Sequence, residues 1–220
     1  MNFAAARDAI SRILASPLAD LTESGHLSSF PEVRPREWHL PNDSELLWTH
    51  GLPPARDDGL LGVAAEFQTT IDPEEAIDTT RLFRLATFGT GRLAAAVDGS
   101  GVFCLPKYTE VHPQLRHLHP EGIKPSLANF TIAAFVDCAW RWHWLLPVLA
   151  RVETQLGEEE IAWFTTNREA FARGEAQPTQ VERERDTYLD LCRSLVAAFQ
   201  ERDSAITPGS LWAETILDNR

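Results

Sequence analysis

The chain has 220 residues, of which 44% are hydrophobic, and this length and composition predict one globular domain with a sizeable core. Asp and Glu number 32 against 20 Lys and Arg, which gives a formal net charge of -12. This acidity argues against a protein that follows nucleic-acid phosphates or binds an anionic membrane surface, because both of those partners are negatively charged. It favours a soluble protein, or one with a basic partner.

The cysteines Cys104, Cys138 and Cys192 lie far apart, each within an apolar stretch. Their odd number and wide spacing predict reduced thiols, as in a cytoplasmic protein. No charged segment precedes an apolar run at the N-terminus, so we expect no signal peptide. The longest apolar stretch, residues 132–149, is interrupted by charged residues and a proline, so we expect no membrane span.

The first half of the chain predicts two helices and a loop. Apolar residues at helical spacing indicate a short amphipathic helix over residues 3–14, which Pro17 ends. Residues 16–43 are rich in proline and predict a loop. A second helix carries Leu46, Leu47 and Trp48, and Gly51 ends it. Its first free backbone N–H groups have candidate caps in three polar residues, Asn42, Asp43 and Ser44.

A block of strands follows. Candidate strands span residues 63–70 and 82–88, and Pro73 is expected to begin a turn or a short helix between them. In residues 89–106, two alternating apolar runs flank Asp98-Gly99-Ser100-Gly101. Asp and Gly tolerate the positive φ of tight turns, so this stretch predicts a β-hairpin.

The C-terminal half is predicted to be mainly helical. Residues 107–125 form a loop, and a strand follows around residues 123–129. Residues 131–146 predict the strongest helix, which Pro147 kinks or restarts. Two further helices are expected at residues 158–173 and 179–202, and a short one ends the chain at residues 210–217. Helices, then an antiparallel strand block, then helices indicate an α+β fold: a central, mostly antiparallel sheet flanked by helices.

Several motifs could carry chemistry, and each has a structural interpretation that we favour. His112, His117 and His119, with Glu110 or Glu121, could bind a metal, but their spacing is not that of a zinc motif, and exposed loop histidines fit as well. We therefore expect no metal, no cofactor and no catalytic residue.

The other candidates also have structural explanations. Gly89-Thr90-Gly91 lacks the rest of a phosphate-binding motif, and Asp98 is occupied in its turn. Cys138 lies mid-helix, without a catalytic signature. His143 stands among Trp140, Trp142 and Trp144, which a helix divides between two faces, so core packing explains them.

Two acidic clusters are candidate partner-binding residues: Asp57 and Asp58, and Glu158, Glu159 and Glu160. The second cluster has an alternative explanation, since it stands where a predicted helix begins and negative charge is favourable at a helix N-terminus.

Motifs in order along the chain resemble the SUKH superfamily of immunity proteins, named for Syd, US and Knr homology, and its fourth group in particular. These are Leu46 with Gly51-Leu52-Pro53, the stretch Leu93 to Val102, the stretch Asn129 to Val136, and Trp212. The resemblance covers about Ser44 to Leu217. Phe130, where a small residue is usual, and the first forty residues depart from the pattern.

The resemblance implies one SUKH-like domain over residues 1–220, with an N-terminal helix and loop over 1–43 and a helical C-terminal part over 157–217. It implies no enzymatic activity. It implies a cytoplasmic bacterial antidote whose partner is a cognate toxin domain from a polymorphic toxin system, one that acts on nucleic acid. The acidic charge suits a partner with a basic cleft, while no direct binding of nucleic acid and no membrane are expected.

Two other functions stay open on the sequence. The same fold could serve a regulatory or scaffolding protein that binds another cellular partner. The chain could also be an enzyme with an unrecognised pocket, which convergent polar groups with shifted pKa values would reveal.

Overall fold

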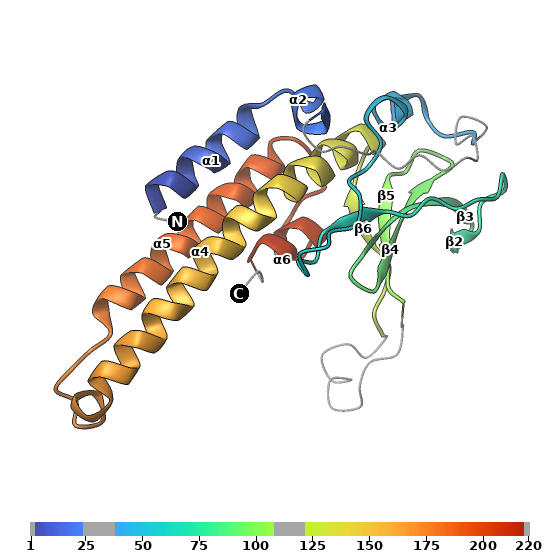
Figure 1. The fold of residues 1–220 in the computed structure, drawn as a ribbon. Helices are drawn as coiled ribbons and strands as arrows, with labels where there is room; N and C mark the ends of the chain where they lie inside the picture. Colours follow the sequence, from blue (N-terminus) through green and yellow to red (C-terminus); the bar gives the residue numbers. More distant parts are fainter. Residues whose placement is uncertain (1–2, 24–37, 108–121, 218–220) are drawn as a thin grey trace.

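The structure, a computed structural model, describes residues 3–23, 38–107 and 122–217 (Figure 1). In this part of the chain six strands form one antiparallel sheet in the order β1-β3-β4-β5-β6, with β2 also paired to β3. The strands are β1 (Val63–Ala65), β2 (Glu75–Ile77), β3 (Thr80–Phe88), β4 (Gly91–Ala96), β5 (Val102–Leu105) and β6 (Ser126–Asn129). The predicted α+β class is confirmed.

The helices surround one side of this sheet. They are α1 (Phe3–Ala15), α2 (Leu18–Glu23), α3 (Glu45–His50), α4 (Ile132–Ala172), α5 (Thr179–Gln200) and α6 (Leu211–Leu217), with a 3-10 turn η2 (Asn42–Ser44) before α3. Figure 1 shows α4 and α5 running side by side and extending well beyond the sheet, with α1 along them. None of the described helices combines the length and apolar character needed to cross a bilayer.

The predicted hairpin is present as β4 and β5, and its turn is built as the sequence indicates. The Asp98 carboxylate accepts hydrogen bonds from the Ser100 N–H at 3.0 Å and the Thr80 hydroxyl at 3.2 Å, and Gly99 has φ of 78°. Gly101 has φ of 130°, and a Cβ atom there would lie 2.5 Å from the Asn129 carbonyl oxygen. Glycine is therefore required where β5 meets β6.

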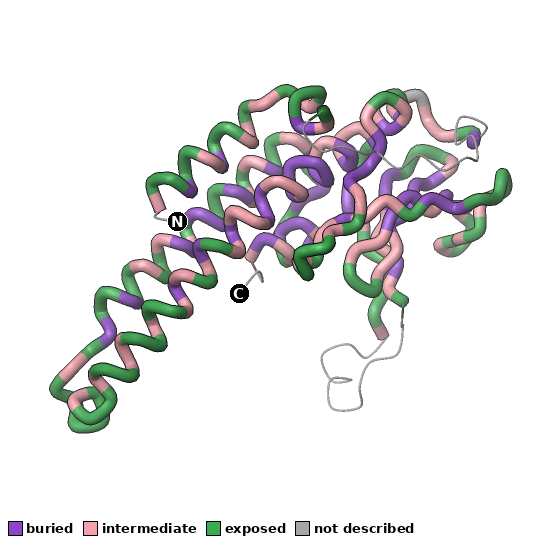
Figure 2. Tube along the Cα trace, in the orientation of Figure 1, coloured by how far each residue is buried: buried purple, intermediate pink, exposed green. Residues whose placement is uncertain are grey.

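The main core lies between α4 and one face of the sheet. Phe83, Leu93 and Val102 pack there with Phe135 and Trp140 of α4. Figure 2 shows buried residues concentrated at the end of α4 and α5 nearer to the sheet and becoming scarce toward the far end of the two helices. The opposite face of the sheet carries a small second cluster, made of Leu82, Ala94, Ala96 and Leu105.

Two arginines attach α1 to the central helices. The last carbonyl groups of a helix have no partner within it. Arg141, which is 6% exposed, donates to the carbonyl oxygens of Ile13 at 2.6 Å and of Ser16 at 3.1 Å. Arg202 donates to the Leu14 carbonyl at 2.7 Å, and the Asp137 carboxylate accepts from both guanidinium groups at 2.8 and 3.1 Å. The two arginines therefore hold the C-terminal end of α1 against the central helices.

The prediction that residues 158–173 form a separate helix is wrong, because α4 is one helix of 41 residues that passes through Pro147 and Gly157. Gly157 costs only about 1 kcal/mol in a helix interior, which packing against α5 can offset. Pro147 lacks the N–H that would bond the carbonyl of His143, and Arg56 supplies a donor to that carbonyl instead, at 2.7 Å.

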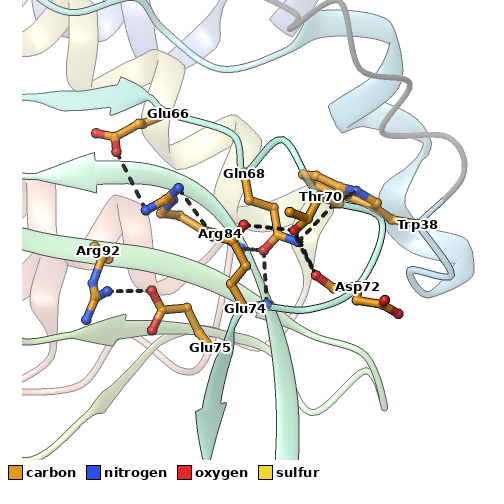
Figure 3. A network of polar contacts seen from close by, with 9 residues as sticks. All are labelled: Trp38, Glu66, Gln68, Thr70, Asp72, Glu74, Glu75, Arg84 and Arg92. Carbon is orange, nitrogen blue, oxygen red and sulfur yellow. Dashed lines mark hydrogen bonds and ion pairs between the residues drawn. The ribbon is translucent and has the colours of Figure 1, made fainter.

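The strand prediction over residues 63–70 is wrong beyond Ala65, and Gln68 is the reason. This residue is fully buried, and its side-chain oxygen accepts a hydrogen bond from the Arg84 N–H at 3.1 Å, while its amide donates to the Asp72 carbonyl at 2.8 Å (Figure 3). The backbone N–H groups of Glu66 and Gln68 still donate to the Leu85 and Arg84 carbonyls, both at 3.1 Å. The Gln68 side chain thus interrupts the regular ladder beside the bulge in β3, between Arg84 and Ala86.

Two further segments differ from expectation. Residues 18–23, predicted as loop, form α2, whose Leu21 is buried. Residues 75–77, expected in a turn or short helix, form β2, because Asp78 at φ of 50° reverses the chain into β3. Neither segment is long enough to show a period in the sequence.

Two of the caps predicted for α3, Asp43 and Ser44, make other hydrogen bonds. No side-chain cap bond is made at the start of that helix. The Ser44 hydroxyl accepts from the Trp48 indole N–H at 3.0 Å. The Asp43 carboxylate accepts from the Ile132 N–H at 2.8 Å, and so satisfies an N-terminal donor of α4 instead.

Candidate functional site

The loop of residues 56–61 lies across α4, and Pro147 explains how it is held there. Arg56 donates a hydrogen bond to the His143 carbonyl, which has no helical donor because of Pro147. The Arg56 side chain is only 13% exposed. The same guanidinium pairs with the Asp58 carboxylate, with Nε 2.9 Å from Oδ1 and 3.1 Å from Oδ2. Arg56 therefore joins the helix and the loop.

Asp58 organises the loop. Chiefly through the hydrogen bond from Arg56, the pKa of this carboxyl is lowered to about 2, so it is ionised at neutral pH. Its Oδ1 also accepts from the Leu60 N–H at 3.2 Å. Since Arg56 balances its charge locally, Asp58 mainly fixes the shape of the loop, while exposed Asp57 beside it carries charge toward solvent.

A shallow hollow of about 670 Å³ lies between this loop and α4, and we call it the loop hollow. It is lined by Asp58, Leu60, Pro147, Ala150, Arg151, Thr154, Gln155 and Glu158. The structure thus brings together Asp58 and Glu158, one residue from each acidic cluster that the sequence indicated.

The other two members of the second cluster differ in their surroundings. Glu159 is exposed and accepts a hydrogen bond at 2.7 Å from Gln155, which lines the loop hollow. Glu160 instead pairs with Arg185 of α5. The helix N-terminus explanation for this cluster is wrong, because all three residues lie in the interior of α4. Negative charge at Glu158 and Glu159 therefore has no helix-terminal role.

His143 lies under the loop but has no partner that would make it a base. Its ring stands edge-on to Trp140 and Trp144, at centroid distances of 5.8 and 5.4 Å. Burial and then the Arg56 charge lower the pKa of His143 to about 4, so the ring is neutral at neutral pH. Its Nδ1 is buried and has no hydrogen-bond partner among the described residues.

Other chemistry-bearing side chains are dispersed. Burial raises the pKa of the Cys104 thiol and of the Cys138 thiol, which disfavours a thiolate at either position. Within the described residues no group of three or more His, Cys, Asp or Glu is placed to hold a metal ion. The histidines His112, His117 and His119 lie outside the described residues.

Acidic residues on the sheet are already paired. Glu75 accepts from Arg92 at 2.5 Å, and Arg84 lies 3.8 Å from Glu66 and 3.5 Å from Glu74 (Figure 3). These carboxylates balance two arginines of the second face of the sheet. The sheet therefore offers less uncompensated negative charge than the surface around Asp57, Glu158 and Glu159.

Two residues of the motif that resembles SUKH proteins have a structural role. The Asn129 side chain is buried, donates to Asp203 at 2.9 Å and accepts from the Trp212 indole N–H at 2.8 Å. Asp203 also accepts from the Phe130 N–H at 2.9 Å. The network ties β6 to α6 through the turn after α5, and Asp203 carried no sequence signal that would have identified it.

A scan of the chain against protein-family models found no match, and searches of curated proteins and of solved structures likewise found none. The resemblance to the SUKH superfamily therefore stays a prediction that rests on sequence motifs. What can be said of function comes from the surface around the loop of residues 56–61.

Proposed function

We propose that the chain acts by binding another protein, through the loop of residues 57–61 and the adjoining turns of α4. The partner we propose is a toxin domain from a bacterial polymorphic toxin system, which the chain neutralises as an immunity protein. The observation that carries this proposal is the meeting of Asp58 and Glu158 in the loop hollow, since they come from two acidic clusters far apart in the chain.

The charge of this surface supports a basic partner. Asp57, Glu158 and Glu159 are exposed, against one exposed arginine, Arg151, in the lining of the loop hollow. The chain as a whole carries a formal charge of -12. Charge complementarity of this kind mainly raises the association rate and lowers the affinity for wrong partners. A toxin domain that acts on nucleic acid has a basic cleft, and an acidic surface placed over that cleft would exclude the nucleic acid.

The form of the surface also supports binding rather than chemistry. The loop hollow is shallow and open, whereas catalytic pockets usually enclose most of a small ligand. A loop fixed by an ion pair and a helix carbonyl presents its exposed residues at little entropic cost on binding. Leu61, which is 69% exposed, adds an apolar group to the same loop.

The test is co-expression with the toxin domain encoded by the neighbouring gene. The wild-type chain should restore growth and co-purify with that domain. Failure of both would overturn the proposal. Binding to another cellular protein, without rescue, would favour a regulatory or scaffolding role instead.

Charge-reversal variants locate the surface. Glu158→Lys should slow association with the toxin domain by about tenfold at low salt, because steering depends on charge near the interface. Glu169→Lys is the matched control, since Glu169 is 91% exposed on the far end of the same helix. Equal effects of the two substitutions would place the interface away from the loop hollow.

A further inference from the structure

A second groove shares Leu60 with the loop hollow, and we call it the apolar groove. Its volume is about 440 Å³. It is lined by Gly59, Leu60, Leu61, Phe88, Trp142, Leu146, Leu211, Glu214 and Thr215. Leu60 lines both hollows, so the groove is continuous with the surface proposed above to bind a protein.

The lining of the groove is largely apolar. Five of its lining residues are leucine or phenylalanine, and Leu61 is 69% exposed. Exposure of large apolar side chains to water costs free energy. The pockets of protein interfaces often receive an aromatic side chain of the partner. The lining therefore favours an occupant with a large apolar side chain.

Trp142 lines the same groove with its ring, while its polar atom is buried. Its side chain is 1% exposed, and the indole N–H has no hydrogen-bond partner among the described residues. The neighbouring tryptophans differ, since Trp140 donates to the Gly51 carbonyl at 3.1 Å and Trp144 to the Leu21 carbonyl at 3.0 Å. Trp142 therefore offers an occupant of the groove the apolar surface of its ring, and its indole signal reports on that surface.

Glu214 gives the groove a charge. It is exposed in the first turn of α6 and lines the groove together with the apolar residues. A carboxylate there disfavours fatty acids and other anionic apolar ligands, and it favours a basic group beside the apolar one. The net charge of -12 acts in the same direction.

We propose that the apolar groove binds a peptide segment of a partner protein in which an aromatic residue is followed by arginine or lysine. The aromatic ring packs on Leu60, Phe88 and Leu146, beside the ring of Trp142. The basic residue pairs with Glu214. That this segment belongs to the toxin domain rests on the proposed function, whereas the chemistry of the groove does not.

The experiment uses the full chain and the peptide acetyl-Gly-Phe-Arg-Gly-amide as probe. In a ¹⁵N-labelled sample, the indole N–H signal of Trp142, assigned by its loss in Trp142→Phe, should shift as the peptide reaches millimolar concentration, because the ring current of the bound phenylalanine acts on it. The Trp144 indole, which is not part of the groove lining and donates to the Leu21 carbonyl, is the internal control and should not move. Absence of a shift at Trp142 would overturn the inference.

Two control peptides test the two halves of the motif. Exchange of Phe for Ala should weaken binding at least about tenfold, because it removes the anchor. Exchange of Arg for Glu should weaken binding to a similar degree at low salt, because it places like charges together. Equal binding of all three peptides would overturn the inference.

Variants of the chain separate this inference from the proposed function. Leu61→Asp should abolish the peptide-induced shift while leaving the thermal midpoint unchanged, because Leu61 is mostly exposed. Concentration-dependent self-association that Leu61→Asp abolishes would instead make a second copy the occupant and overturn the inference. A toxin complex without peptide binding would refute the groove alone, and peptide binding without a toxin complex would refute the proposed toxin partner alone.

Discussion

Replacement of Arg56 by methionine would test how the loop of residues 56–61 is held on α4. Methionine keeps most of the apolar stem of the side chain and removes the guanidinium. The substitution leaves the His143 carbonyl without the donor that Arg56 supplies at 2.7 Å, and it breaks the ion pair with Asp58. Pro147 makes the first loss serious, because no helical N–H is available to replace Arg56.

The expected cost follows from these two interactions. A hydrogen bond from a charged donor to a part-buried carbonyl contributes about 1.5–3 kcal/mol. The ion pair adds little, about 0–1 kcal/mol, because the Asp58 side chain is 38% exposed and water screens it. Arg56→Met should therefore lower the free energy of unfolding by about 2–3 kcal/mol.

A double-mutant cycle with Pro147→Ala isolates the role of the proline. Alanine restores an N–H at position 147, which can bond the His143 carbonyl within the helix. In the Pro147→Ala background, Arg56→Met should therefore cost about 1 kcal/mol less than in the wild-type chain. Pro147→Ala alone should not destabilise the protein, since alanine is the best helix former.

Urea unfolding followed by circular dichroism gives all four free energies, provided that the slopes agree between variants. An equal cost of Arg56→Met in both backgrounds would refute the idea that the arginine compensates for the proline. The loop would then be held by the Asp58 pair alone, and Asp58→Asn should be as destabilising as Arg56→Met.

Three further predictions concern pH, a buried network and a turn. The pKa of His143 falls from 6.5 to about 4 on folding, so between these values the unfolded state binds a proton that the folded state does not. The free energy of unfolding should therefore fall by about 1–2 kcal/mol as the pH drops from 6.5 to 4, after allowance for a ring that is partly exposed. The urea midpoint should depend less on pH in His143→Gln, and an unchanged slope would contradict this. Asn129→Leu should cost about 3 kcal/mol, since it leaves the buried Trp212 indole N–H unpaired and removes one of the donors to Asp203. A thermal midpoint near that of the wild type would show that water replaces the amide. Gly101→Ala should cost more than about 2 kcal/mol, because its Cβ would lie 2.5 Å from the Asn129 carbonyl oxygen. Gly59→Ala, also at positive φ but in open space, should cost about 1 kcal/mol. Equal costs of the two substitutions in urea unfolding would rule out the steric explanation.

The sequence predicts those parts of the fold that local pattern determines. The hairpin over residues 89–106 is correct because alternation and an Asp-Gly turn both act within a few residues. The continuity of α4 could not be predicted, since whether Pro147 breaks a helix depends on Arg56, which is distant in the chain. The early end of β1 depends in the same way on the side chain of Gln68, which accepts a hydrogen bond from the Arg84 N–H and so interrupts the regular backbone ladder.

The candidate site shows the same division. Composition and clustering identified the five acidic residues, and two of them line one hollow. Periodicity could not indicate that Glu160 faces Arg185 or that Asp58 is paired with Arg56, because partners in α5 and in the loop are set by tertiary packing. The apolar groove was missed for another reason: its lining comes from the loop, β3, α4 and α6, and no single segment carries its pattern.

The position of Pro147 links the fold to the proposed binding surface. In a helix interior the backbone carbonyls are normally hydrogen-bonded within the helix, so a loop that crosses it can bond only to side chains. The proline frees the His143 carbonyl at one point, Arg56 binds it there, and Asp58 then fixes the loop by pairing with Arg56. Because the loop is fixed at that point, its next residues line both the loop hollow and the apolar groove, and Asp57 and Leu61 stay exposed. Variants that release the loop, such as Arg56→Met, should therefore weaken partner binding even though Arg56 itself is largely buried, and they should do so through faster dissociation, because the exposed charges that steer association are retained.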